Sequence, residues 1–537
     1  MAPSPPLVAP TDGPIHRRLF RRLSSFPLLP RTNSASRFLA DAAAAAAAGK
    51  SSRPVELLRR RVRIRHNISS PLGAVLLLPV MLVVLVLQFL HWHSGGSVMG
   101  SLLLSSSAHL PPIRSLNETI DAPFSTGCMV PDTSKPRANA VLVILARNKE
   151  LSGVLDSMNS IERHFNRWFH YPYLFLNDGD FNSTFRATVL NHTQSKVEFG
   201  TISKELWEFP AWSDPAEVAE GIALQGDAAI MYGGMESYHH MCRFYSGQFY
   251  KHPLLAKYDW YWRVEPDVKY FCDITYDPFV YMQEQGKVYG FTILIKELVE
   301  TVPNLFRYAS GFRRSHNIAS KGMWEVFLQK DEKKREEPPA PPPTPPAAEG
   351  EQTAEGASIE PPAPPVEDFK FPEPKDIDPE AMNGEKYNLC HFWSNFEIAR
   401  LDFFRSRQYE EFFQFLDRSG GFWNERWGDA PVHSLAAGIF LSPSQVHYFR
   451  DIGYRHTTIQ HCPGNAPRKQ LPRTPYVRDP RNKKDLEEDR YWDSWDVERE
   501  NGVGCRCKCD TDIIDVEGKE GSCLPSWVDA VGGWTSP

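Results

Sequence analysis

The 537-residue chain lacks the short motifs that mark the commonest nucleotide- and metal-dependent enzymes. It contains no G-x-x-x-x-G-K-[ST] sequence, no G-x-G-x-x-G opening a helix and no H-E-x-x-H. The usual ATPase, dehydrogenase and zinc-protease classes are therefore excluded. An excess of positive charge is also missing, because the formal net charge is -6. We expect no global attraction to nucleic acid.

Cysteine is sparse as well. Nine cysteines in this length are too few for a fold held together mainly by disulfides, and an odd number leaves at least one free or paired between chains. Which of them pair cannot be deduced from the sequence. The remaining composition, 42% hydrophobic and 12% aromatic, is typical of a folded α/β or α+β protein.

One long apolar run is present. Pro71–Leu90 carries no charge and has about the length that a helix needs to cross a bilayer. Five arginines precede it within Arg59–Arg65, which predicts a cytosolic N-terminal side and a single-pass type II membrane protein. A cleaved signal peptide fits poorly, since the run is too long and too far from the N-terminus. A buried core helix is the other alternative. The modest length of the run favours the ER or Golgi over the plasma membrane.

Glycosylation sequons agree with this topology. Asn117, Asn182 and Asn191 begin sequons beyond the anchor, where the glycosylation machinery could reach them. Asn67 lies before the anchor and should stay unmodified. All nine cysteines also follow the anchor, in a compartment where disulfides persist.

Composition divides the rest of the chain. Pro, Ser, Arg and Ala dominate the N-terminal segment, and a second Pro-rich stretch interrupts the folded part. The predicted organisation is a disordered cytosolic tail (1–70), a transmembrane anchor (71–90), a stem (91–134), a catalytic domain (135–523) with a disordered insert (331–380), and a C-terminal tail (524–537).

The folded part begins as an alternation of strands and helices. Ala140–Leu145 is a continuous apolar run followed by a helical pattern to about Phe165, and further strands are predicted at Tyr171–Leu176, Tyr258–Val264 and Lys287–Ile293. This order predicts an open, mixed but mostly parallel α/β sheet. Ligands of such sheets bind beyond the carboxyl ends of the strands.

Carboxylates follow two of these strands. Glu265 and Asp267, separated by one proline, could hold Mn²⁺ or Mg²⁺ and through it a nucleotide diphosphate. The plainer interpretation is a turn with solvated acids. Asp178-Gly179-Asp180 also follows a strand and could contact a nucleotide, whereas Asp510-Thr511-Asp512 is interpreted as a turn.

Three more residues could carry chemistry. Glu397 lies in an aromatic stretch and could act on a developing sugar cation, although a glutamate on a helix surface is the simpler interpretation. Asp429, next to a glycine, can recognise sugar hydroxyls. His456 could supply a nitrogen ligand to a metal, although a lone histidine is more often structural.

Seven blocks, taken in order, resemble the fungal α-1,2-mannosyltransferases of glycosyltransferase family 15. They are ARNKEL, FLND, ESYHHMCRFYSGQFY, YWRVEPDVKYFCD, YNLCHFWSNFEIA, ERWGDAPVHSLA and DIGYRHTTIQHCP. The resemblance covers about Lys135 to Cys523 apart from the insert. It implies a type II Golgi enzyme with a nucleotide-binding domain of the glycosyltransferase A type. It also implies GDP-mannose as donor, Mn²⁺ as cofactor and retention of the α linkage.

The resemblance assigns roles residue by residue. It implies that Glu265, Asp267 and His456 bind the metal and that Glu397 is the nucleophile. A further set is implied to contact the donor or its nucleotide: Tyr238, Asp429, Arg147, Asn177, Asp178 and Arg263. The chain departs from the pattern in its Pro-rich insert, its long N-terminal tail and the sequence NDGD, which leaves the role of Asp180 open.

The predicted activity is transfer of mannose to mannose-terminated N- or O-linked glycans of secretory and cell-wall glycoproteins. Glu397 would either form a covalent mannosyl intermediate or stabilise a same-face substitution. The alternative is a non-catalytic mannoside-binding protein on the same fold, and a glycosidase is a weaker one. Partnership with other Golgi mannosyltransferases, the acceptor and the oligomeric state stay open.

Overall fold

The structure is a computed structural model that describes residues 61–65, 68–71, 128–330, 382–467, 470–513, 515–517 and 519–532. The chain divides into two compact units, Met1–Ser107 and Ala108–Pro537. In the first, strands β1 (Arg61–Arg65) and β2 (Ile68–Pro71) pair antiparallel, in a segment for which the sequence predicts no regular structure.

The anchor beyond Pro71, most of the stem and the Pro-rich insert lie outside the described residues. Within the part of the chain that is described, no helix combines the length and apolarity that crossing a membrane requires.

A seven-stranded sheet forms the centre of the second unit, in the order β12-β8-β11-β6-β3-β4-β5. Every neighbouring pair is parallel except the two that involve β11, so the predicted mixed, mostly parallel sheet is confirmed. The strands are β3 (Ala140–Leu145), β4 (Tyr173–Asn177), β5 (Val197–Thr201), β6 (Trp260–Val264), β8 (Tyr289–Phe291), β11 (Phe396–Arg400) and β12 (Val446–Tyr448).

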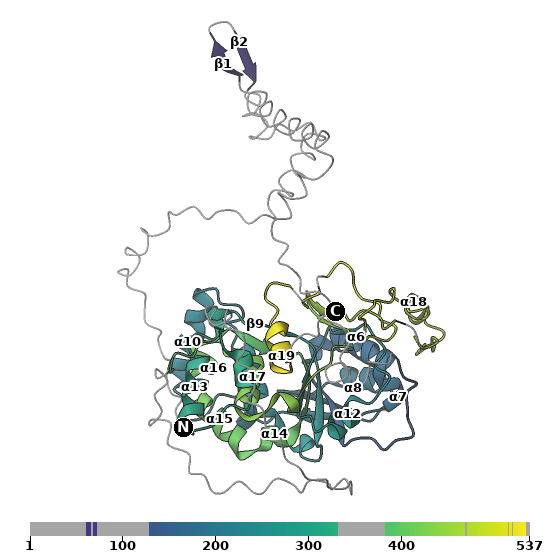
Figure 1. The fold of residues 1–537 in the computed structure, drawn as a ribbon, viewed down its shortest axis with the longest axis horizontal. Coiled ribbons are helices and arrows are strands. Elements are labelled where there is room, and N and C mark those ends of the chain that lie inside the picture. The colour runs from purple at the N-terminus through teal and green to yellow at the C-terminus, as the bar shows by residue number, and fades with distance from the viewer. Residues whose placement is uncertain are drawn as a thin grey trace, which may run out of the picture. The chain divides into compact units, whose positions relative to one another are not determined.

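Both faces of this sheet are buried. Successive side chains of a strand point to opposite faces, and those of β3 are apolar on both. In β3, Val141 and Val143 belong to one apolar cluster, and Leu142 and Ile144 to the other. Figure 1 shows one group of helices on one side of the sheet, α13 (Leu305–Ser315), α15 (Arg407–Arg418) and α17 (Asp429–Phe440), and another on the other side, α6 (Leu151–Ile161), α8 (Ser183–Leu190) and α12 (Pro278–Glu284). This explains why β3 reads as a continuous apolar run.

The helices and minor strands complete the unit. The helices are α6 (Leu151–Ile161), α7 (Arg167–Phe169), α8 (Ser183–Leu190), α9 (Lys204–Trp207), α10 (Pro215–Asp227), α11 (Glu236–Gly247), α12 (Pro278–Glu284), α13 (Leu305–Ser315), α14 (Leu401–Arg405), α15 (Arg407–Arg418), α16 (Gly421–Asn424), α17 (Asp429–Phe440), α18 (Lys483–Tyr491) and α19 (Leu524–Ala530). Strands β9 (Leu294–Lys296) and β10 (Cys390–Phe392) pair, and β7 (Lys269–Tyr270), β13 (Tyr454–His456) and β14 (Ile459–His461) form a third sheet.

Two predictions need correction. Glu397 lies in strand β11 and is completely buried, so the interpretation as a helix-surface glutamate is wrong. The folded domain also does not end at Cys523, because Leu524 and Trp527 of α19 pack into the core. Their apolar side chains bury a helix that composition alone assigned to a tail.

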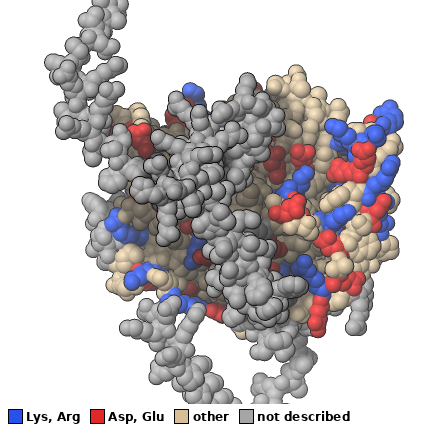
Figure 2. All heavy atoms as spheres, turned by 90° about the horizontal axis from the view of Figure 1, so that it is seen from above, with Lys and Arg blue, Asp and Glu red and all other residues tan. Residues whose placement is uncertain are grey.

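Four disulfides connect the C-terminal residues to the domain: Cys128–Cys505, Cys272–Cys507, Cys390–Cys523 and Cys462–Cys509. Cys242 is buried and free, as the odd cysteine count requires. On the face shown in Figure 2, basic and acidic side chains of the described residues are interspersed and do not gather by sign.

Candidate active site

A cavity of about 300 Å³ opens at the carboxyl ends of β3, β4 and β6. The chain runs outward from β3 to β4 and β5 on one side, whereas β6 lies on the other, so this is the point where the strand order reverses. Such a switch point is where open α/β sheets bind ligands. We call it the switch-point pocket. Its lining consists of Leu145, Ala146, Arg147, Glu150, Asn177, Asp178, Trp207, Met235, Ser237, Tyr238, Met241, Glu265, Pro266, Asp267 and His456.

The turn after β6 presents two carboxylates. Asp267 has a φ of 63°, in the left-handed region, and its backbone N–H donates to the Gly153 carbonyl at 3.0 Å. A Cβ on Gly153 would lie 2.6 Å from a carboxylate oxygen of Asp267. Only glycine in the first turn of α6 therefore lets this carboxylate pack there. The Glu265 carboxylate instead accepts from Nε of Arg263 at 2.5 Å.

His456 enters the pocket from β13. Its Nδ1 atom is buried and has no hydrogen-bond partner, and its ring lies 5.7 Å from that of Trp393. Burial lowers the pKa of His456, against the opposing attraction of Glu265 and Asp267. A neutral imidazole with an unpartnered nitrogen beside two carboxylates is a donor set that suits Mn²⁺.

Residues at the ends of β3 and β4 form the opposite wall. Arg147 donates to Glu150 from its side chain, and its backbone N–H donates to the same carboxylate at 2.8 Å. Asn177 donates to the Gly179 carbonyl at 2.8 Å, which holds Asp178 at the pocket edge. Asp180 accepts from Thr201 at 2.9 Å and does not line the pocket.

Tyr238 of α11 closes the pocket on a third side. Its ring stacks on that of Tyr232, with centroids 4.7 Å apart, and its hydroxyl accepts from Arg426 at 3.4 Å. Burial raises the pKa of Tyr238 well above its ordinary range, so the phenol stays protonated. The pocket thus has an aromatic, hydrogen-bonding side facing its charged side.

A buried ion pair stands behind the pocket wall. Arg263 lies between Glu265 and Asp429, to which it donates, and its guanidinium rests 3.6 Å from the centroid of the Tyr245 ring. Asp429 also accepts from Ser394 Oγ at 2.6 Å. Burial alone would raise the pKa of Asp429, but Arg263 and His433 outweigh it and hold that pKa below its ordinary value.

Glu397 is the innermost charged group of this network. It is 0% exposed, and its two oxygens accept from the hydroxyls of Tyr261 and Tyr289. His433 Nδ1 lies 2.8 Å from Glu397, and His433 Nε2 lies 2.9 Å from the Tyr245 carbonyl.

Because a carbonyl only accepts, His433 Nε2 carries a proton, and a second proton lies between His433 Nδ1 and Glu397. Burial raises the pKa of Glu397. Burial opposes protonation of His433, but the attraction of Glu397 outweighs it and raises the pKa of His433. The pair therefore holds that shared proton at neutral pH.

Seven of the ten predicted site residues line the switch-point pocket: Arg147, Asn177, Asp178, Tyr238, Glu265, Asp267 and His456. The other three, Arg263, Glu397 and Asp429, lie behind it and are buried. Strand register explains this, because Glu397 stands directly opposite Arg263 and shares its face of the sheet.

Sequence reasoning missed His433, Tyr261 and Glu150. His433 follows Asp429 by one helical turn, and Tyr261 precedes Arg263 by two residues in a strand, so the helix and strand periods could have found them. Glu150 follows Arg147 by three residues, which is the spacing of a reciprocal cap.

Acids, an imidazole and an arginine at the switch point of a mostly parallel sheet define a nucleotide-binding α/β enzyme. A family model described as glycolipid 2-alpha-mannosyltransferase matches residues 106–346 and 363–471. The chain belongs to this family.

Relatives span most of the chain. The O-glycoside alpha-1,2-mannosyltransferase homolog 4 of Schizosaccharomyces pombe is 44% identical over 479 residues, covering 89% of this chain and 94% of the relative. The probable mannosyltransferase KTR5 of Saccharomyces cerevisiae is 46% identical over 401 residues, covering 70% of this chain and 75% of the relative.

Solved structures are similar as well. The Mn/GDP form of core-mannan synthase A from Aspergillus fumigatus has a TM-score of 0.56 and 30% identity, covering 78% of this chain and 94% of that one. The mannosyltransferase Ktr4p of S. cerevisiae in complex with GDP has a TM-score of 0.51 and 34% identity, covering 63% and 76%. The mixed sheet with its helices thus matches mannosyltransferases of the glycosyltransferase A type.

Proposed function

We propose that this chain is a retaining α-1,2-mannosyltransferase that transfers mannose from GDP-mannose to a mannose-terminated glycan. The observation that carries the proposal is the convergence of Arg147, Asn177, Asp178, Tyr238, Glu265, Asp267 and His456 on one pocket at the sheet's switch point. The similar structures contain GDP, and one contains manganese as well. This supports the same donor and cofactor here.

Glu265, Asp267 and His456 would hold Mn²⁺. They fit it by donor chemistry, and His456 adds a buried Nδ1 atom without a hydrogen-bond partner. In this structure the ligand atoms of the three residues do not all lie within 4.8 Å of one another, so the side chains would have to come closer together to bind the ion. When bound, a divalent cation neutralises the charge that develops on the departing diphosphate. Arg147 would contact the nucleotide from the end of β3, where its pairing with Glu150 orients the guanidinium.

We assign positioning roles to Arg263 and Asp429. Arg263 holds Glu265 from behind, and Asp429 compensates the charge of Arg263 in the buried interior. Without Asp429, Arg263 would keep Glu265 and Ser394 as partners but would lose the carboxylate that fixes its guanidinium from the other side.

For Glu397, the geometry favours same-face substitution over a covalent intermediate. To attack the donor, the carboxylate would have to leave Tyr261, Tyr289 and His433, and it has no exposed surface from which to do so. In the favoured route the acceptor hydroxyl attacks the face that GDP leaves, and its proton passes to the departing phosphate oxygen. Glu397, paired with His433, holds Tyr261 and Tyr289 in place behind the site.

Mass spectrometry of the protein with GDP-mannose and no acceptor tests this choice. We expect no mannosyl adduct on Glu397, and an adduct there would establish the covalent route. Glu397→Gln should lower kcat, whereas full activity in that variant would exclude both roles.

We also propose that the enzyme is a single-pass type II protein of the Golgi membrane, anchored by residues 71–90. Four disulfides and exposed asparagines at the sequons of Asn182 and Asn191 support a secretory compartment. Protease protection in sealed Golgi vesicles, with a tag at each terminus, tests the topology. Protection of the N-terminal tag would contradict it.

The activity test measures GDP release from GDP-mannose with methyl α-mannoside as acceptor, with and without Mn²⁺. We expect turnover only when donor, acceptor and metal are all present, and a product with an α-1,2 linkage by NMR. Binding of mannosides without Mn²⁺-dependent turnover would instead support a non-catalytic mannoside-binding protein.

A further inference from the structure

A second and larger cavity, of about 780 Å³, lies among the C-terminal residues. We call it the C-terminal cleft. It is lined by Gln460 of β14, by the turn 462–464, and by side chains within 495–502 and 509–525. Most of this lining lies beyond residue 471, where the family match ends, and none of it belongs to the switch-point pocket.

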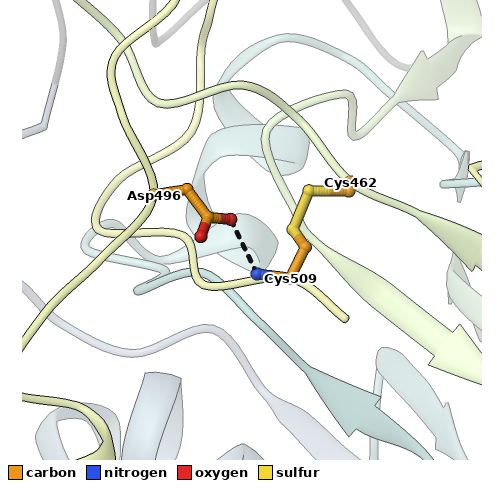
Figure 3. Close-up of side chains that lie close together, drawn as sticks. All are labelled: Cys462, Asp496 and Cys509. Carbon is orange, nitrogen blue, oxygen red and sulfur yellow. Dashed lines mark hydrogen bonds between the residues drawn. A yellow bond between two sulfur atoms is a disulfide. The ribbon is translucent and has the colours of Figure 1, made fainter. Parts of the chain in front are cut away.

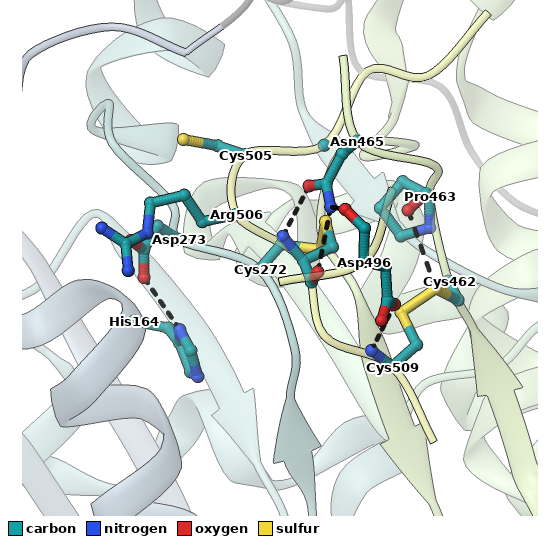
Figure 4. Close-up of a disulfide and its surroundings, with 12 residues drawn as sticks. His164, Cys272, Asp273, Cys462, Pro463, Asn465, Asp496, Cys505, Arg506 and Cys509 are labelled. Carbon is teal, nitrogen blue, oxygen red and sulfur yellow. Dashed lines mark hydrogen bonds and ion pairs between the residues drawn. A yellow bond between two sulfur atoms is a disulfide. The ribbon is translucent and has the colours of Figure 1, made fainter. Parts of the chain in front are cut away.

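Covalent bonds fix the cleft wall. Cys462 and Cys509 both line the cleft and are joined to each other, and Cys507 is bonded to Cys272 of the domain. Asn465 accepts from the Cys507 backbone N–H at 2.6 Å and donates to its carbonyl at 3.0 Å. Figure 4 shows Asn465 among the disulfide-bonded loops, with Asp496 and the Cys462–Cys509 bond nearby. The cleft is therefore a preformed cavity, although loops build it.

The cleft is not a metal site. Within the described ranges, Cys462, Asp496 and Cys509 are the only group of three metal-type ligands whose atoms lie within 4.8 Å of one another. Figure 3 shows that both sulfurs are used by the disulfide and that Asp496 accepts from the Cys509 backbone N–H. No thiolate is left to bind an ion.

Charge in the cleft is mixed: Arg450, Arg499 and Lys519 line it together with Asp496, Asp510, Asp515 and Glu517. Glu517 lies 3.6 Å from Arg450, Asp510 pairs with Arg455, and Asp515 accepts from the Cys462 backbone N–H at 2.6 Å. Such a lining has little net charge to offer an anion or a cation. It favours a neutral ligand with many hydroxyl groups.

Two side chains of the cleft lining, Gln460 and Trp495, favour a sugar as its ligand. Gln460 is 2% exposed and donates from Nε2 to the Asp510 carbonyl at 3.0 Å, which fixes its orientation. Its Oε1 is buried without a partner, and a hydroxyl donor would satisfy it. Trp495 is 37% exposed, with Arg506 4.7 Å from its ring centroid, so part of the indole is free for a sugar ring to stack on.

The third sheet connects this cleft to the switch-point pocket. In β13, His456 lines the pocket, whereas the adjacent Arg455 contacts Asp510 of the cleft. Gln460 belongs to β14, which pairs with β13. One hairpin therefore contributes residues to both cavities.

We infer that the C-terminal cleft binds the mannoside chain of the acceptor glycan. Trp495 and Gln460 contact mannose units away from the one that receives the new residue. This inference rests on the proposed function, because it takes the acceptor to be a mannoside. The inference adds to the proposed function a specificity site that lies outside the reacting centre.

Direct binding tests the inference. The detergent-solubilised full-length protein is titrated with α-linked mannotetraose by calorimetry, without GDP-mannose. We expect binding by the wild type and about tenfold weaker binding by Trp495→Ala and by Gln460→Leu. Trp495→Phe should keep most of the affinity, because it retains an aromatic face. Tyr491→Ala, which removes an exposed aromatic outside the cleft, should bind as the wild type does.

Kinetics separate this inference from the proposed function. In Trp495→Ala we expect KM to rise about tenfold for mannotetraose, with kcat and the KM values for methyl α-mannoside and GDP-mannose unchanged. Equal effects on both acceptors, or wild-type affinity in both cleft variants, would overturn the inference. Trp495-dependent binding without turnover on any acceptor would overturn the proposed activity and leave the cleft as a mannoside site.

Discussion

The switch-point pocket and the C-terminal cleft are built in opposite ways. The switch-point pocket is the smaller, about 300 Å³, and rests on strand ends with buried ion pairs behind them. The C-terminal cleft is about 780 Å³ and is made of loops held by disulfides. The larger cavity is therefore not the one with catalytic chemistry. Side chains that bind a metal and a diphosphate have to be held in fixed positions, here by buried ion pairs. A neutral sugar chain instead requires a large contact surface with hydrogen-bonding groups.

Removing a pocket carboxylate should have the largest effect. We expect Glu265→Ala to lower turnover on the order of 10²- to 10³-fold, because it removes a proposed ligand of the metal at the departing diphosphate. GDP release measures this loss, and circular dichroism checks the fold. Glu517→Gln in the C-terminal cleft is the matched control and should keep wild-type turnover with methyl α-mannoside.

Breaking the buried ion pair between Arg263 and Asp429 should lower both the stability and the activity of the enzyme. Asp429→Asn leaves Arg263 short of a charged partner, and we expect the free energy of unfolding to fall by about 3 kcal/mol. Urea unfolding measures it. Asp417→Asn breaks the comparable buried pair with Arg243, whose Nε donates at 2.8 Å, away from the pocket.

Both variants should lose stability, but only Asp429→Asn should also lower kcat/KM for GDP-mannose. An equal kinetic loss in Asp417→Asn would mean that the effect is a general one on folding, and the positioning role of Asp429 would have to be abandoned.

Removing the Cys462–Cys509 disulfide should affect the C-terminal cleft and leave the switch-point pocket unchanged. The Cys462–Cys509 bond spans 47 residues, and replacing both cysteines by serine should destabilise the C-terminal residues by about 2–4 kcal/mol. Hydrogen exchange by peptide locates the change. The KM for GDP-mannose should stay at its wild-type value, and a rise would show that the two cavities are not independent.

Acid should gradually loosen the C-terminal segment at the contact between Arg478 and His192. Burial, together with Arg478, lowers the pKa of His192 to about 4, and Arg478 Nη1 lies 2.6 Å from His192 Nδ1. The unfolded chain binds this proton more readily, so the contribution of His192 to stability is complete above about pH 6.5. It is lost as pH falls toward 4, at about 1.4 kcal/mol per pH unit.

Exchange protection of residues 470–513, corrected for intrinsic rates, should therefore fall between pH 6.5 and 4.5. The pocket strands should keep their protection over the same range. His192→Gln should flatten the profile, and an unchanged slope would assign the acid sensitivity to another group.

Much of the switch-point pocket could be predicted from the sequence. The apolar run of β3, the acids after β4 and β6, and the ordered family blocks placed seven residues on one cavity. Glu397 and Asp429 were expected beside the donor but are buried, because whether a side chain faces the cavity depends on strand register and helix packing. The partners of the cysteines also depend on which loops meet in space.

The sequence by itself determined the family, the alternation of strands and helices, and the residue types that can bind a metal and a diphosphate. These are local properties of apolar runs, strand ends and ordered motifs. Only the tertiary structure decided that Glu397 shares a proton with His433, that α19 packs into the core, and that Gln460 and Trp495 line one cleft. Each of these joins residues far apart in the chain, and only packing brings them together.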